Sequence, residues 1–323
     1  MEEVMTMSRR TFLKTSGGAV IAAGIVGAIE PLKAVADPWR PLKNRPAGDK
    51  LKGEEAEILR LASLAPSGHN TQPWTVQIVK TGHWVIGTDR GRWLPAVDPH
   101  NREVMLSLGA FLENLVIAAG VHGYGVDYRV IAKSGFDRDV IDVRLKKGAG
   151  RDFPVSLIEK RRTLRNGMGN GDIRTGDYAI LTDGLTATAE YFSRNSSRGR
   201  LLAERTIEAN RVQAWREPAQ QELADWIRWS DADVKKYRNG LTPASMEITG
   251  FAGWYVRTFF NRSSVLSKSF RERGVEMVKK QVENCGGWIV LGGDDSVSTL
   301  VETGRSFQSC LLYTSDAADE EDS

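Results

Sequence analysis

Residues 65–74, with the sequence APSGHNTQPW, constrain the fold more than any other stretch of the chain. The loop follows an apolar helical pattern over 54–64 and precedes a strand-like run over 76–79. Each proline fixes its own φ and favours an extended residue before it, and the glycine allows backbone angles that other residues avoid. We therefore expect a stiff loop that holds three polar side chains at fixed positions, as binding loops often do: Ser67, His69 and Asn70. The alternative is an ordinary helix-to-strand turn with Trp74 in the core.

The N-terminus has the features of an export signal. Residues 8–14, SRRTFLK, form a twin-arginine pattern, followed by a modestly apolar stretch over 17–29 and the small residues AVA at 34–36. This order predicts a signal peptide over 1–36, recognition by the twin-arginine (Tat) export machinery, and a periplasmic or exported protein. A short membrane anchor or an amphipathic start is the alternative.

The C-terminal segment, residues 310–323, differs abruptly from the helical pattern before it. Residues 310–323 resemble the translation of a sequencing-library adapter, which predicts a non-native tail and a natural chain that is truncated after 309. An acidic disordered tail is the alternative. The domain between the two ends is then 37–309, and its single cysteine, Cys285, is expected to be buried packing.

Composition and charge exclude several classes of function. The net charge is +3 with the basic residues scattered, which gives no basis for a nucleic-acid partner. The four histidines show no metal-ligand spacing, and no P-loop, dinucleotide fingerprint or nucleophile elbow is present, so no catalytic residue is predicted. Helices are expected over 54–64, 102–119, 269–282 and from 296, and strands over 75–79, 84–88, 126–132, 140–145 and 286–293. Gly109, inside the second of these helices, is expected to let another backbone approach closely.

The loop A-P-S-x-x-N-x-Q-P-W between a helix and a strand resembles the flavin loop of the nitroreductase superfamily. In that family the Pro-Ser turn and the asparagine lie against the isoalloxazine of FMN. The resemblance implies that three residues contact the ring: Pro66, Ser67 and Asn70.

A basic cluster follows later in the chain. Residues 161–165 read RRTLR, and guanidinium groups with a hydroxyl suit a phosphate. A solvated basic turn is the alternative. The cluster is similar to the R-R-S-x-R motif of nitroreductases, and the resemblance makes FMN contacts of Arg161, Thr163 and Arg165, with Arg162 less strongly implied.

The segments 94–99 (LPAVDP), 107–109 (SLG) and 113–115 (ENL) resemble the Acg-like branch of the superfamily. That branch implies an α+β fold, with a mixed sheet flanked by helices, in which one chain imitates both halves of a nitroreductase dimer. The protein is then a monomeric pseudo-dimer or a homodimer, and the number of flavin sites stays open.

The resemblance implies an FMN-dependent oxidoreductase. Two electrons pass from a reductant, NAD(P)H, to a small-molecule acceptor of the nitro or quinone type. The alternative is a protein that binds or sequesters FMN with little turnover. Residues 230–268, whose periodicity is weak, are hypothesised to form a lid over the flavin.

Overall fold

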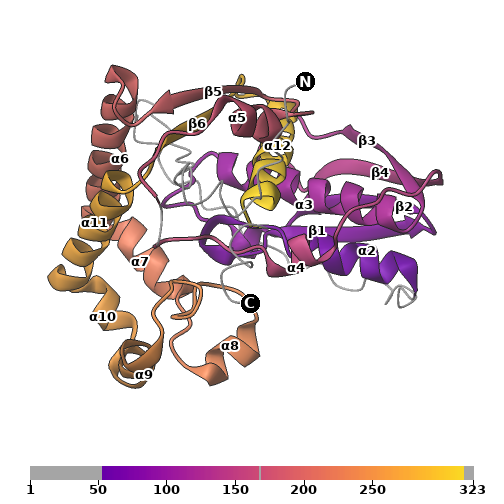
Figure 1. Cartoon of the computed structure of the whole chain (residues 1–323). Helices are drawn as coiled ribbons and strands as arrows, with labels where there is room; N and C mark the ends of the chain where they lie inside the picture. Colours follow the sequence, from indigo (N-terminus) through magenta and orange to yellow (C-terminus); the bar gives the residue numbers. More distant parts are fainter. Residues whose placement is uncertain (1–52, 167–168, 316–323) are drawn as a thin grey trace.

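The computed structural model describes residues 53–166 and 169–315, and it shows the predicted α+β class. Two long helices, α3 (Arg102–Val121) and α12 (Val297–Ser315), lie side by side at the centre (Figure 1). One sheet lies to one side of them, and the helices α6 (Ser197–Trp215) and α11 (Lys268–Glu283) lie to the other. The signal peptide predicted over 1–36 lies outside the described residues.

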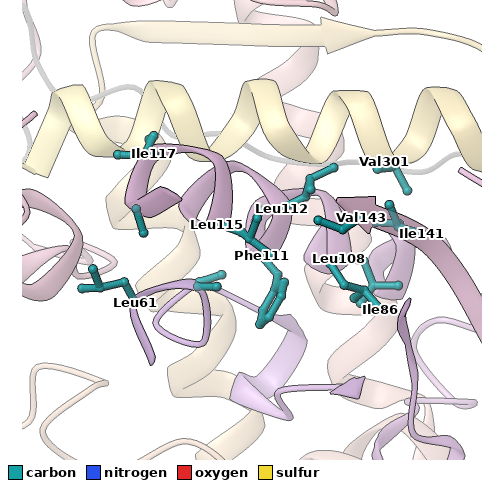
Figure 2. Packing of buried hydrophobic residues seen from close by; sticks show 14 of the residues in the cluster. Leu61, Ile86, Leu108, Phe111, Leu112, Leu115, Ile117, Ile141, Val143 and Val301 are labelled. Carbon is teal, nitrogen blue, oxygen red and sulfur yellow. The ribbon is translucent and has the colours of Figure 1, made fainter. Parts of the chain in front are cut away.

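The larger sheet has four strands in the order β1-β2-β4-β3, and every neighbouring pair is antiparallel. The strands are β1 (Trp74–Lys80), β2 (His83–Thr88), β3 (Tyr124–Val130) and β4 (Asp139–Lys147). Apolar residues of β2 and β4 pack against α3, and so does α2 (Glu54–Ala62); Figure 2 shows Ile86, Ile141 and Val143 near Leu108, and Leu61 at the other end of the cluster. This core fixes the helix that leads into the loop at 65–74 and the strand that leaves it.

The crossing of α3 and α12 depends on two glycines. A Cβ on Gly109 would overlap the carbonyl oxygen of Val301, and a Cβ on Gly304 would overlap that of Leu106. The two backbones therefore touch where side chains are absent, which confirms the expectation for Gly109. α3 is long and apolar enough to cross a membrane by length and composition, but 78% of its apolar window is buried inside the protein. Its place in the core accounts for that composition.

The smaller sheet is the antiparallel pair β5 (Thr188–Ser193) and β6 (Gly287–Gly292). The strands of the described residues thus form two separate antiparallel sheets. Trp288 of β6 and Cys285 are buried with Val282 of α11 and residues of α6, so Cys285 is buried packing as expected.

Four helices lie at one end of the molecule: α7 (Glu217–Trp226), α8 (Asp231–Tyr237), α9 (Gly250–Phe259) and α10 (Arg262–Leu266). A third cluster of apolar residues, with Trp229 and Val265 buried in it, includes residues of three of them, α7, α9 and α10. The weakly periodic stretch 230–268 is therefore largely helical. Two further short helices are α4 (Ser156–Lys160) and α5 (Thr175–Thr182).

The predicted boundary at 310 falls inside a helix. α12 continues to Ser315, and Leu312 is buried in the main core. The remainder of the predicted non-native tail, from 316 onward, lies outside the described residues.

Candidate functional site

The loop at 65–74 has an unusual backbone. Its centre is a short 3-10 turn, Gly68–Asn70, and three residues that are not glycine have left-handed φ angles: His69 (47°), Asn70 (52°) and Gln72 (54°). Each such residue costs on the order of 1 kcal/mol, and strain of this kind persists where the surrounding structure enforces it, often at functional sites.

Hydrogen bonds hold the strained loop closed. The Ser67 Oγ accepts from the backbone N–H of Gln72 at 2.9 Å, and Arg92 Nη1 donates to the Gln72 carbonyl at 2.9 Å. The Trp74 ring packs on Phe111 of α3 with 5.3 Å between centroids. Loop and core are thus rigidly connected. Pro66 lies half-buried in the loop's first turn.

Gly68 is required for space. Its φ is not in the left-handed region, contrary to the expectation that it supplies unusual backbone angles. A Cβ on Gly68 would lie 2.7–2.9 Å from the carboxyl atoms of Glu103, in the first turn of α3. The glycine therefore lets the loop rest directly on this carboxyl group.

The basic segment, residues 161–165, follows the short helix α4. Arg161 is largely buried, burial lowers the pKa of its guanidinium, and its Nε and Nη1 have no hydrogen-bond partner among the described residues. Burial also lowers the pKa of Arg165. Arg162 and Thr163 are exposed.

One segment, Arg238 to Glu247, holds both the loop and the basic segment; we call it the bridging segment. On the loop side, Asn70 Nδ2 donates to the Gly240 carbonyl at 3.0 Å, and the Gly240 N–H donates to the Asn70 carbonyl at 2.9 Å. Gln72 Nε2 also donates to the Arg238 carbonyl at 2.8 Å.

On the other side, the bridging segment binds the end of the basic segment. The Glu247 carboxylate accepts from the backbone N–H of Arg165 at 3.0 Å and from Asn166 Nδ2 at 2.9 Å. Arg165 Nε donates to the Ser245 carbonyl at 3.3 Å. Two stretches far apart in sequence are therefore fastened to the same ten-residue region.

His69 connects the loop electrostatically with the basic segment. Its pKa is lowered to about 4, first by burial and then by the positive charge of Arg165. The imidazole is therefore neutral at pH 7, and its buried Nε2 has no partner among the described residues. The structure thus brings Arg165 within electrostatic reach of the loop.

Acidic groups lie beneath the loop. The pKa of Glu103 is raised to about 7, first by burial and then by the charges of Asp98 and Glu222. Asp98 caps α3 by accepting from the Arg102 and Val104 N–H groups, and Glu222 accepts from the N–H groups at 96 and 97. The sequence gives no signal for Glu103, because an acidic residue in the first turn of a helix ordinarily only complements the helix dipole.

Among residues 53–166 and 169–315, no group of three or more His, Cys, Asp or Glu side chains could hold a metal ion. The polar groups of the loop, the basic segment and the first turn of α3 are a guanidinium with two unpaired nitrogens, a neutral imidazole, an amide, a hydroxyl and a carboxyl with a raised pKa.

Comparison with known proteins finds distant relatives. No protein-family model matches the chain. A probable NAD(P)H nitroreductase of Serratia sp., PigM, is 36% identical over 72 residues, which are 22% of this chain and 20% of that protein. Two Mycobacterium tuberculosis proteins, each named a putative NAD(P)H nitroreductase, are 28% identical over 127 residues, which are 38% of this chain and 37% of each of them.

The matched region thus spans between about a fifth and two fifths of these relatives. These weak homologues support a relationship of the chain to the nitroreductase superfamily.

Proposed function

We propose that the protein is an FMN-dependent oxidoreductase of the Acg-like branch, which passes two electrons from NAD(P)H to a nitro- or quinone-like acceptor. The names of the distant relatives support an oxidoreductase in general. The observation that carries the finer proposal is the convergence of the loop and the basic segment on one bridging segment; the basic segment also contains Arg161, whose Nε and Nη1 have no partner among the described residues.

The basic segment supplies the groups for the phosphate end. A buried guanidinium whose Nε and Nη1 lack partners costs free energy until an anion accepts from them. Arg161 and Arg165 would bind the phosphate oxygens, and the exposed hydroxyl of Thr163 would add a neutral donor. Arg162, which is exposed, would act through its charge alone.

The loop supplies the groups for the ring end. The Nδ2 of Asn70 is committed to Gly240, which leaves its Oδ1 to accept from an N–H of the ring. The Ser67 oxygen accepts within the loop, so its O–H proton remains for donation to the ring. Pro66 shapes the turn. Bound FMN supplies the hydride chemistry, and the protein positions it and controls access.

The bridging segment also favours the second candidate, a protein that sequesters FMN. It lies within the proposed lid, 230–268, and its hydrogen bonds to Asn70 and Gln72 hold it against the loop. A lid that stays closed would keep acceptors away from the flavin. Deletion of α8 to α10 should therefore increase the accessibility of bound flavin to a soluble quencher, and an unchanged accessibility would contradict the lid.

One experiment distinguishes an oxidoreductase from a protein that only sequesters FMN. The protein loaded with FMN is mixed with NADPH under anaerobic conditions, and its yellow colour is followed. Bleaching within seconds, reversed by a quinone, supports an oxidoreductase. Colour that persists for hours supports sequestration, and protein that binds no flavin contradicts both.

Export through the twin-arginine machinery and a pseudo-dimeric chain complete the proposal. A twin-arginine pattern at 8–14 supports the first. Replacement of Arg9 and Arg10 by lysine should retain the protein in the cytoplasm, as measured by cell fractionation. Light scattering of the purified protein separates a monomeric pseudo-dimer from a homodimer.

A further inference from the structure

Glu103 is an exposed residue whose carboxyl group adjoins the loop at 65–74. It lies against Gly68, the centre of the loop that would hold the flavin ring. None of the residues that the structure describes donates a hydrogen bond to this carboxyl, whereas Asp98 and Glu222 are occupied by backbone N–H groups. The Glu103 side chain also keeps exposed surface, so a small molecule can reach it.

The proposed reaction needs a group of this kind. Reduction of a quinone to a hydroquinone takes up two electrons and two protons. A hydride equivalent delivers both electrons and one proton, which leaves one proton to be supplied from elsewhere. A positioned acid that gives up this proton in the transition state typically accelerates such a step by about 10²- to 10⁴-fold.

We propose that Glu103 is the acid that donates the second proton to the acceptor. The proton leaves the carboxyl and forms an O–H bond on the acceptor oxygen that does not receive the hydride. The resulting carboxylate takes a new proton from water before the next turnover. This inference rests on the proposed function, because it assigns a residue to the oxidative half of that reaction.

The surrounding charges suit the assignment. Burial, and then the negative charges of Asp98 before α3 and Glu222 of α7, raise the pKa of Glu103 to about 7. His69 on the loop is neutral at pH 7, and the positive charge of Arg165 helps to lower its pKa after burial, the larger cause. Arg102, the neighbour of Glu103 on α3, is paired with Asp295 at 2.7 Å. Glu103 therefore holds its proton over a pH range in which an ordinary glutamate is ionised.

The test separates the two half-reactions of the FMN-loaded protein by stopped-flow absorbance. Glu103→Gln keeps the size and polarity of the side chain but cannot donate an acidic proton. Bleaching by NADPH should proceed at the wild-type rate, and reoxidation by a quinone should slow by at least about 10-fold. Reoxidation by ferricyanide, which takes electrons without protons, should be unchanged.

The pH profile provides the second readout. Wild-type reoxidation by the quinone should fall as the pH rises through about 7, because Glu103 loses its proton there. Glu103→Gln should lose this dependence, and Glu103→Asp, which restores an acid, should recover part of the rate. Glu276→Gln, on an exposed position of α11, is the matched control and should behave like the wild type.

The outcomes are distinguishable. Wild-type rate and pH profile in Glu103→Gln would overturn the role of Glu103 and leave the oxidoreductase intact. Equal slowing with quinone and ferricyanide would assign the residue a structural role and also overturn the proposal. A wild-type protein that NADPH does not bleach would overturn both.

Discussion

Replacement of Arg161 by methionine should stabilise the protein without flavin and weaken its binding of FMN. The guanidinium is largely buried, and its Nε and Nη1 have no hydrogen-bond partner among the described residues. An unsatisfied buried donor costs about 1–3 kcal/mol, so two of them cost about 2–4 kcal/mol after partial relaxation. Methionine removes both donors and fills most of the volume with an apolar, adaptable chain.

The effect on binding has the opposite sign. A hydrogen bond to a charged group contributes about 1.5–3 kcal/mol, so loss of Arg161 should weaken FMN binding by about 10- to 100-fold. Thermal unfolding with and without FMN measures both effects on one sample. The variant should unfold at a higher temperature than wild type when flavin is absent, and it should gain less from added FMN.

Arg162→Met is the matched control for this experiment. Arg162 is the next residue in the chain and is exposed, so its replacement should change the stability by less than about 0.5 kcal/mol. Two results would refute the reasoning: an Arg161→Met protein that is less stable without flavin, or one that binds FMN as tightly as the wild type.

Three further predictions concern stability. Gly109→Ala should cost about 3 kcal/mol in chemical denaturation, because its Cβ overlaps the Val301 carbonyl; Gly274→Ala, in α11 with open space around it, should gain up to about 1 kcal/mol, and equal effects would contradict the close crossing. Burial raises the pKa of Glu103 from 4.5 to about 7, so the free energy of unfolding of the wild type should fall by about 1–2 kcal/mol as the pH rises through this range, a figure discounted for the exposure of the side chain. Glu103→Gln should not show this fall, and the two proteins should have the same free energy of unfolding at pH 4. The pKa of His69 is lowered from 6.5 to about 4, so the wild type should lose up to about 3 kcal/mol of stability as the pH falls through this range. His69→Gln should not show this loss, and identical acid-unfolding curves of the two proteins would contradict the neutral imidazole.

Local patterns predicted the elements that carry the site. Helical spacing predicts α2 and α3, and alternation predicts β4. α2 and β4 each bury one face in the main core, whereas α3 is buried on most sides because α12, α2 and the larger sheet all pack against it. Gly109 was assigned its role because a glycine inside an apolar helix commonly marks a close backbone approach. A local pattern does not mark where the adapter-like segment begins, because α12 continues without a break through 310 to 315.

The contacts that assemble the site could not be predicted from the sequence. The hydrogen bonds from Asn70 to Gly240 and from Gln72 to Arg238 join residues that no periodicity connects. The role of Gly68 was misjudged for the same reason: the group that needs the space, Glu103, lies on another element. The site residues named from the resemblance, from Pro66 to Arg165, stay predictions until a flavin is measured in contact with them.

The central claim is that the loop and the basic segment bind opposite ends of one FMN molecule. Fluorescence titration with FMN and with riboflavin, which lacks the phosphate, tests it directly. Arg161→Met should weaken FMN binding by about 10- to 100-fold and leave riboflavin binding unchanged, whereas Asn70→Ala should weaken both. An Arg161→Met protein that loses affinity equally for both flavins, or for neither, would contradict the account.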